Sequence, residues 1–146
     1  TRFQRMSRHL SVVMLDIDHF KRVNDTHGHP TGDRVIKSLA MLLKQRLRKS
    51  DLIGRYGGEE FALVLLDADA AQAANVVDEL RERFMKMRFQ GSAGEFTCTL
   101  SAGVAECLPS DDKAGLDWIA EADLALYQAK TGGRNQVVVA QSPRAD

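Results

Sequence analysis

Two adjacent glycines, Gly57 and Gly58, constrain the fold of this 146-residue chain more than any other feature of its sequence. They separate two strand-like stretches, residues 51–56 and 59–66, and a two-residue glycine turn is typical of a tight antiparallel hairpin. Parallel neighbours would instead need a crossover connection of about a dozen residues or more. The hairpin therefore excludes a purely parallel, doubly wound sheet.

The chain before the hairpin predicts one strand and two helices. Residues 11–15 form a short apolar run, typical of a buried strand that carries Asp16 at its carboxyl end. We expect a short helix next, capped by Asp18 and stopped by Gly28. A longer helix is expected over residues 31–50, where apolar side chains recur three and four positions apart.

The chain after the hairpin predicts two further helices and two further strands. The third helix should begin near Asp69, and a loop should then lead into a strand over residues 96–106, weakened or bulged at Gly103. The cluster of Ser110, Asp111 and Asp112 is expected to start the fourth helix. The last strand is expected over residues 136–140, and the tail over residues 141–146 should be disordered.

This order of elements indicates one α+β domain over residues 1–146, with helices flanking a mainly antiparallel central sheet. A chain of this length buries about two thirds of its surface on folding, so it needs no disulfide framework. We therefore interpret Cys98 and Cys107 as free thiols in a reducing compartment, and expect a cytoplasmic protein.

Composition excludes two classes of partner. Lysine and arginine together number 20, as do aspartate and glutamate, and a formal net charge of zero argues against a nucleic-acid binder. The apolar runs are far shorter than the 18 or so residues expected of a membrane span. We therefore expect neither nucleic acid nor membrane contact by this segment.

Acidic residues cluster at two places that the fold can bring together. Asp16 ends the first strand, and Glu59 and Glu60 follow the hairpin turn, so the two stretches meet if strand and hairpin are neighbours. Mg²⁺ prefers such oxygen ligands and takes its remaining ligands from water and substrate phosphates. The backbone carbonyl of Ile17 could complete the set. The alternative is a helix cap and a solvated glycine turn.

Cationic and amide residues suggest a nucleotide pocket. Lys21, Lys130 and Arg134 could contact phosphates, or could pair with carbonyls at helix ends, although Arg134 lies beyond the last helix. Asn24 and Asp33, which we place in the loop region after the first helix, could read a guanine edge. Turn and capping chemistry is their alternative explanation.

Three segments carry a family resemblance. DIDHFKRVNDTHGHPTGD at residues 16–33, RYGGEEF at 55–61 and AKTGGRNQV at 129–137 closely resemble the GGDEF family of diguanylate cyclases, here with a GGEEF signature. The resemblance covers residues 11–139. It implies a fold like the palm of nucleotide polymerases and class III nucleotidyl cyclases.

The resemblance also implies an activity. Enzymes of this family condense two GTP molecules into cyclic di-GMP and release two pyrophosphates. Each subunit of a homodimer holds one GTP, and the 3′-hydroxyl of each nucleotide attacks the α-phosphate of the other. The implied cofactor is Mg²⁺, with Mn²⁺ as an alternative and two ions in each active half-site.

The resemblance assigns roles to individual residues. Asp16, the carbonyl of Ile17 and Glu59 resemble the metal ligands, and Glu60 resembles the adjacent acid that assists the metal site and proton removal. The remaining residues resemble those that contact the substrate: Lys21, Lys130 and Arg134 at the triphosphate, Asn24 and Asp33 at the guanine with His29 nearby, and Gly57 and Gly58 as the floor.

A further motif indicates regulation. Arg48 and Asp51 match the RxxD pattern at which cyclic di-GMP inhibits its own synthesis in this family. Arg48 would bind a phosphate or the Hoogsteen edge of a guanine of cyclic di-GMP, and Asp51 would accept a hydrogen bond from a base. The alternative is an arginine at a helix end followed by an aspartate that starts a strand.

The resemblance has two departures and leaves two rival functions. His27 stands where the family often has an aromatic ring. The family's usual opening segment is absent, so residues 1–9 are expected to be the end of its helix, and the chain a catalytic domain without its upstream sensory or dimerising module. One rival is a receptor that binds GTP or cyclic di-GMP without catalysis. The other is a nucleotidyl cyclase with a different base preference.

Overall fold

The protein was analysed as a computed structural model, which describes residues 9–108 and 115–141. The expected helix end at residues 1–8, the helix start at 110–112 and the tail at 142–146 lie outside these ranges. The elements in chain order are β1 (Leu10–Ile17), α2 (Phe20–His27), α3 (His29–Arg46), β2 (Leu52–Arg55), β3 (Glu60–Leu66), α4 (Ala70–Met85), β4 (Phe89–Gly91), β5 (Gly94–Phe96), β6 (Leu100–Cys107), α5 (Gly115–Thr131) and β7 (Val137–Val139).

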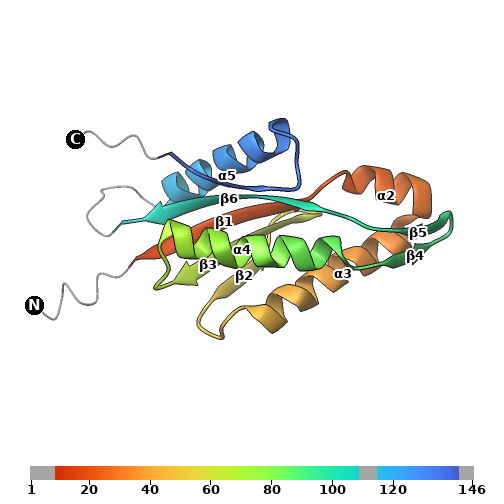
Figure 1. Cartoon of the computed structure of the whole chain (residues 1–146), viewed down its shortest axis with the longest axis horizontal. Coiled ribbons are helices and arrows are strands. Elements are labelled where there is room, and N and C mark those ends of the chain that lie inside the picture. The colour runs from red at the N-terminus through yellow and green to blue at the C-terminus, as the bar shows by residue number, and fades with distance from the viewer. Residues whose placement is uncertain (1–8, 109–114, 142–146) are drawn as a thin grey trace, which may run out of the picture.

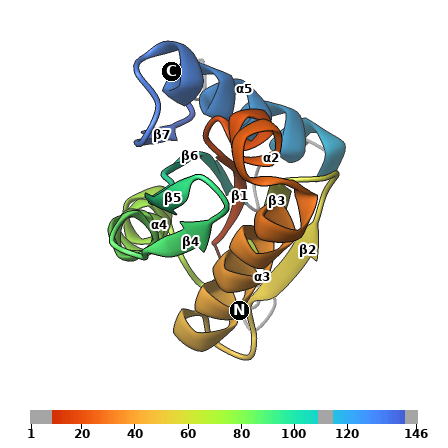
Figure 2. The same ribbon diagram turned by 90° about the vertical axis from the view of Figure 1, so that its right-hand side faces the viewer.

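The central sheet has five strands in the order β2-β3-β1-β6-β7. The pairs β2–β3, β3–β1 and β1–β6 are antiparallel, and only β6–β7 is parallel. Helices α3 and α4 lie on one side of this sheet and α5 on the other (Figures 1 and 2). The predicted α+β fold with a mainly antiparallel sheet is confirmed.

Side chains of β1 alternate between two apolar cores. Val13 and Leu15 belong to the larger core, which also holds buried residues of α3 and α4. Val12 and Met14 belong to a smaller core beneath α5, together with Trp118. Because successive side chains of a strand point to opposite faces, a strand covered on both faces is apolar throughout. This explains the continuous apolar run that predicted β1.

The central hairpin has a turn one residue longer than predicted. Arg55 pairs with Phe61, and the backbone N–H of Tyr56 donates to the carbonyl of Glu60 at 2.7 Å. Residues 57–59 therefore form the turn, and Gly57 has φ +91°, a backbone conformation that favours glycine. As a consequence, Glu59 lies in the turn itself.

The expected cap of the first helix is wrong. The N-cap of α2 is His19, in a left-handed conformation with φ 55°, and no side chain caps the helix. Asp18 bonds to other elements instead. The next helix, α3, begins at His29 with Pro30 in its first turn and ends at Arg46, before the predicted residue 50.

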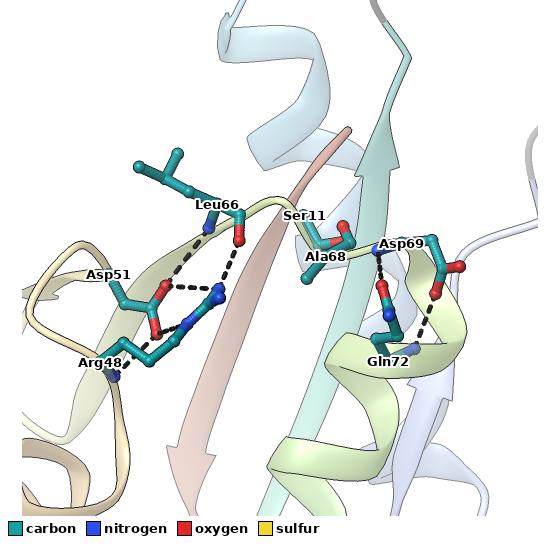
Figure 3. A network of polar contacts seen from close by, with 7 residues as sticks. All are labelled: Ser11, Arg48, Asp51, Leu66, Ala68, Asp69 and Gln72. Atoms are coloured by element: carbon teal, nitrogen blue, oxygen red, sulfur yellow. Dashed lines mark hydrogen bonds and ion pairs between the residues drawn. The ribbon is translucent and has the colours of Figure 1, made fainter. Parts of the chain in front are cut away.

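The start of α4 agrees with the prediction at Asp69. The Asp69 carboxylate accepts from the backbone N–H of Gln72 at 2.8 Å, and Oε1 of Gln72 accepts from the N–H of Asp69 at 2.9 Å (Figure 3). Each residue satisfies a backbone donor of the other, which is a complete capping box.

The structure contains a small hairpin that the sequence did not predict. Residues 89–96, expected to be mostly loop, form β4 and β5, and the following strand begins at Leu100. The hairpin packs against α2, where the rings of His27 and Phe96 stack with centroids 4.1 Å apart. A Cβ at Gly91 would lie 2.1 Å from Nδ1 of His27, so only glycine fits that contact.

The expected weakness or bulge at Gly103 is also wrong. Gly103 pairs in regular register with Met14 on one side and Val138 on the other. The glycine serves helix packing, because a Cβ there would lie 2.1 Å from the carbonyl oxygen of Ala122 and 2.3 Å from the N–H nitrogen of Leu126. The missing side chain lets α5 lie directly on β6.

No helix among residues 9–108 and 115–141 combines the length and the apolar character needed to cross a bilayer.

Replacing Gly103 with alanine should destabilise the fold. The added methyl group meets helix backbone, which cannot move aside as a flexible side chain can, so we expect a loss of about 1–3 kcal/mol in the free energy of unfolding. Urea denaturation measures this loss. Gly54→Ala is the matched control on a strand, since its Cβ would have only an ordinary contact, 3.9 Å from the carbonyl of Ala62. Equal losses in both variants would contradict the packing role of Gly103.

Candidate active site

Strand pairing brings the two acidic stretches together. Asp16 on β1 lies opposite Glu60 on β3, and the N–H of Ile17 donates to the carbonyl of Glu59 at 3.4 Å. Directly opposed residues of an antiparallel pair have Cβ atoms about 4.5–5.5 Å apart. The predicted convergence of these residues is confirmed, and it places three carboxylates at one edge of the sheet.

A lysine from α5 completes this cluster. Nζ of Lys130 donates to Oδ2 of Asp16, and both side chains are largely shielded from solvent. Burial raises the pKa of the Asp16 carboxyl, and the charges of Glu59 and Asp18 add to the rise, while the hydrogen bond and charge of Lys130 oppose it. The net direction is upward, so one cation does not fully compensate the buried acid.

The pKa values of Lys130 and Glu60 are also shifted by burial and by neighbouring charges. Burial lowers the pKa of Lys130, but the bond to Asp16 and the charges of Asp16, Glu60 and Glu59 outweigh burial and raise it. Burial raises the pKa of Glu60, and the charges of Asp16 and Asp123 raise it further. The edge therefore carries an excess of negative charge that a cation would relieve.

The donor set fits a hard divalent cation. Oδ1 of Asp16 is buried and has no hydrogen-bond partner among the residues that the structure describes, while the second oxygen of the same carboxylate is bonded to Lys130. In the described parts of the chain, no three His, Cys, Asp or Glu side chains form a ready cage for a metal. Mg²⁺ needs no such cage, because it takes one or two carboxylates and completes its shell with water and phosphate oxygens.

The three candidate phosphate contacts differ in how closely they are connected to the acidic residues. Lys130 is in the cluster, and Arg134 follows in the α5–β7 loop, where its Nη1 donates to the carbonyl of Lys130 at 3.4 Å. Lys21 lies on the exposed side of α2 and pairs with Asp25 at 3.2 Å. Of the three, only Lys130 bonds directly to an acid of this edge, and Arg134 is joined to it through the Lys130 carbonyl.

The candidate guanine-reading residues lie on helices, so the placement in a loop is wrong. Asn24 is inside α2, whereas Asp33 and His29 are exposed in the first turns of α3. A Cβ at Gly32 would lie 2.0 Å from Oδ1 of Asn24, and this oxygen is buried without a hydrogen-bond partner in the described parts of the chain. An unsatisfied acceptor is costly, which makes Asn24 a candidate ligand-binding residue rather than a turn residue.

The glycine turn is braced by a residue that sequence reasoning missed. Nε and Nη2 of Arg55 donate to the carbonyl of Gly58 at 3.0 and 2.7 Å. No atom lies within 4 Å of a Cβ built on Gly58, so the turn surface is open. Arg55 belongs to the RYGGEEF segment, but its partner is a backbone atom, which residue types alone do not reveal.

Arg48 and Asp51 bond to each other at the opposite end of β3. Nη2 and Nε of Arg48 lie 3.3 and 3.4 Å from the Asp51 carboxylate, and Nη2 also donates to the carbonyl of Leu66 (Figure 3). Asp51 further accepts from the backbone N–H groups of Arg48 and Leu66. The pair borders a hollow of about 290 Å³, which Gln72 also lines.

The family model described as "Diguanylate cyclase, GGDEF domain" matches residues 1–136. Diguanylate cyclase DgcP of Pseudomonas aeruginosa is 42% identical over 132 residues, which cover 90% of this chain and 19% of that protein. Diguanylate cyclase A of Treponema denticola is 35% identical over 133 residues, covering 91% of this chain and 36% of that protein. The chain thus spans little more than a third of such relatives at most.

Solved structures of GGEEF and GGDEF domains have the same fold as this chain. The active GGEEF domain of a diguanylate cyclase from Vibrio cholerae matches with a TM-score of 0.87 and 34% identity, covering 97% of this chain and 88% of that one. The GGDEF domain of DgcB from Caulobacter crescentus, solved in complex with c-di-GMP, matches with a TM-score of 0.88 and 35% identity, covering 97% and 83%.

Replacing Glu60 with glutamine should make stability less dependent on pH. Folding raises the pKa of the Glu60 carboxyl above its ordinary value of 4.5. Such a group stabilises the fold fully at pH values below 4.5, and this stabilisation is lost as the pH rises through the raised pKa. Glutamine has no such loss, so Glu60→Gln should have the higher Tm at pH 7 and the same Tm as the parent near pH 4. Thermal unfolding across pH measures this, and added Mg²⁺ should narrow the gap at pH 7.

Glu82→Gln is the control for this comparison, since its carboxylate lies on the surface near Arg81. A gap that is independent of pH, or equal to that of Glu82→Gln, would contradict the electrostatic account.

Proposed function

Because the chain belongs to the GGDEF family, we propose that it is a diguanylate cyclase domain that condenses two GTP molecules into cyclic di-GMP and two pyrophosphates. The observation that carries this proposal is the pairing of Asp16 with Glu60, which brings Glu59 to the same sheet edge, where Lys130 of α5 bonds to Asp16. In-line phosphoryl transfer depends mainly on positioning and on charge that stabilises phosphate oxygens. The residues at this edge could both position the nucleotide and stabilise the charge on its phosphate oxygens.

Asp16, the carbonyl of Ile17 and Glu59 would hold Mg²⁺, or Mn²⁺ as an alternative, with two ions in each half-site. The unpartnered Oδ1 of Asp16 supports this role. When bound, the ions supply positive charge beside the phosphate oxygens. Lys130, which holds the other oxygen of Asp16, would keep that carboxylate oriented and present an ammonium group to the triphosphate.

The remaining residues would bind and orient GTP. Arg134 and Lys21 would contact the triphosphate, and the open turn of Gly57 and Gly58 would form its floor. Oδ1 of Asn24 and the carboxylate of Asp33 offer acceptors, and the Watson–Crick edge of guanine carries N–H donors. His29 lies four positions before Asp33 on the exposed side of the same helix and would line the same pocket.

Glu60 is suited to assist removal of the proton from the attacking 3′-hydroxyl. Its pKa is raised by burial and by its acidic neighbours, which brings a carboxylate closer to the range of an effective base. With one GTP held by each subunit, the 3′-hydroxyl of one nucleotide would attack the α-phosphate of the other. A homodimer is therefore part of the proposed mechanism.

A direct assay tests the proposal against both rivals. The chain, fused to a coiled-coil dimer, is incubated with Mg²⁺ and either GTP or ATP, and products are identified by mass spectrometry. We expect cyclic di-GMP in the incubation with GTP and no cyclic product in the incubation with ATP. Glu59→Gln should lower the rate by about 100-fold or more without loss of folding, because it removes a charged ligand at the reacting phosphates. Glu82→Gln is the control of equal charge change.

Other outcomes identify the rivals. GTP binding without product would favour a receptor, and a cyclic product from ATP would favour a cyclase of different base preference.

We further propose that cyclic di-GMP inhibits the enzyme at Arg48 and Asp51. An arginine guanidinium has five N–H donors in a planar fork, and such a fork suits a phosphate or the O6 and N7 atoms of guanine. The bond to Asp51 already fixes the guanidinium at the rim of the hollow. A ligand would therefore meet a preorganised group.

Arg48→Ala should raise the inhibitory concentration of cyclic di-GMP about tenfold or more, equivalent to about 1.4 kcal/mol or more of binding free energy. The double variant with Asp51→Ala should be at least as insensitive. Asp51 also holds the backbone of Arg48 and Leu66, so thermal unfolding must accompany its assay. Lys49→Ala, which removes a neighbouring positive charge, should stay sensitive. Unchanged inhibition in the double variant would refute the proposal.

A further inference from the structure

Asp18 is a buried carboxylate that the proposed chemistry leaves without a role. It is 6% exposed and follows directly after Ile17. Its Oδ1 accepts from Oγ of Ser101 at 2.6 Å, and its Oδ2 accepts from Oγ1 of Thr99 at 2.6 Å and from the backbone N–H of Asn135 at 3.0 Å. The carboxylate thus joins the end of β1 to the start of β6 and to the loop after α5.

The loop at Asn135 needs such an anchor. Arg134 and Asn135 have φ values of 64° and 50°, so two consecutive residues other than glycine adopt the left-handed conformation. Asparagine tolerates this conformation, but it is unfavourable for arginine, and it persists there only where surrounding contacts hold it. The Asn135 N–H also lies 3.1 Å from Oγ of Ser101, and its Oδ1 accepts from Nη1 of Arg81 at 2.8 Å.

The anchored loop carries a candidate phosphate contact. Arg134 immediately precedes Asn135, and its backbone N–H donates to the carbonyl of Ala129 at 2.9 Å. The end of β1 is thus tied to this region twice, by Asp16 to Lys130 and by Asp18 to Asn135. These two ties lie on either side of Ile17.

We propose that Asp18 is a positioning residue, which holds the Arg134 loop in register with the acidic edge so that the guanidinium faces the triphosphate. This inference rests on the proposed binding of GTP at that edge. A hydrogen bond to a charged acceptor is shorter and about twice as strong as a neutral one, which suits a carboxylate to maintain a strained backbone. Asp18 itself would not touch the nucleotide.

Nucleotide binding separates positioning from a general structural role. Binding of 3′-deoxyGTP, which lacks the attacking hydroxyl, and of GMP, which lacks the β- and γ-phosphates, is measured with Mg²⁺ by calorimetry or competition. Asp18→Ala should weaken 3′-deoxyGTP about tenfold, the loss of roughly one charge-assisted contact, and leave GMP unchanged. Asp18→Asn, which keeps one carbonyl acceptor, should recover part of the loss.

A double-mutant cycle with Arg134→Ala tests whether Asp18 acts through that residue. If it does, the double variant binds 3′-deoxyGTP no more weakly than Arg134→Ala alone, whereas independent effects add. Glu106→Ala is the matched control, because this carboxylate also sits on the sheet and accepts a backbone N–H, that of Ala70 at 2.9 Å, at the far end of β6. It should leave binding unchanged.

Amide hydrogen exchange provides a readout that needs no nucleotide. Asp18→Ala should speed exchange over residues 132–136, and Glu106→Ala should not. Unchanged exchange there, equal weakening of GMP and 3′-deoxyGTP, or additive effects in the cycle would each overturn the inference. If the parent chain binds neither nucleotide, the proposed function fails and this inference fails with it, an outcome distinct from a parent that binds 3′-deoxyGTP and shows additive effects.

Discussion

The register between β1 and β3 is the constraint on which the candidate site depends. Because side chains alternate along a strand, a slip of one residue would exchange the side chains that β1 places in the larger and the smaller core and would separate Asp16 from Glu60. The two apolar cores on either side of the sheet therefore fix the position of the acids. Packing and chemistry are set by one pattern of hydrogen bonds.

The cost of gathering acids at this edge is visible in their protonation equilibria. Burial and mutual repulsion raise the pKa values of Asp16 and Glu60, and Lys130 compensates them only in part. A divalent cation at this edge would offset that charge, and Oδ1 of Asp16, which has no hydrogen-bond partner among the described residues, would be free to bind it. The proposed affinity for a cation and the reduced stability without one would thus have the same origin.

Local patterns predicted most of the fold, and long-range contacts account for what was missed. The glycine turn, the apolar periodicity and Asp69 located the main elements because each depends on neighbours a few residues away. β4 and β5 are too short to show alternation, and they are held by His27, more than 60 residues earlier in the chain. Asp18 looked like a helix cap, yet its partners lie more than 80 residues away.

The missing side chain of Gly103 has a consequence for charge as well as for packing. It allows α5 to rest on β6 at Leu126, and Lys130 comes one helical turn later. The depth at which this helix is seated therefore determines how far the ammonium group reaches toward Asp16. The lack of a side chain at Gly103 therefore influences how fully the Lys130 ammonium group offsets the charge of Asp16 at the far end of the helix.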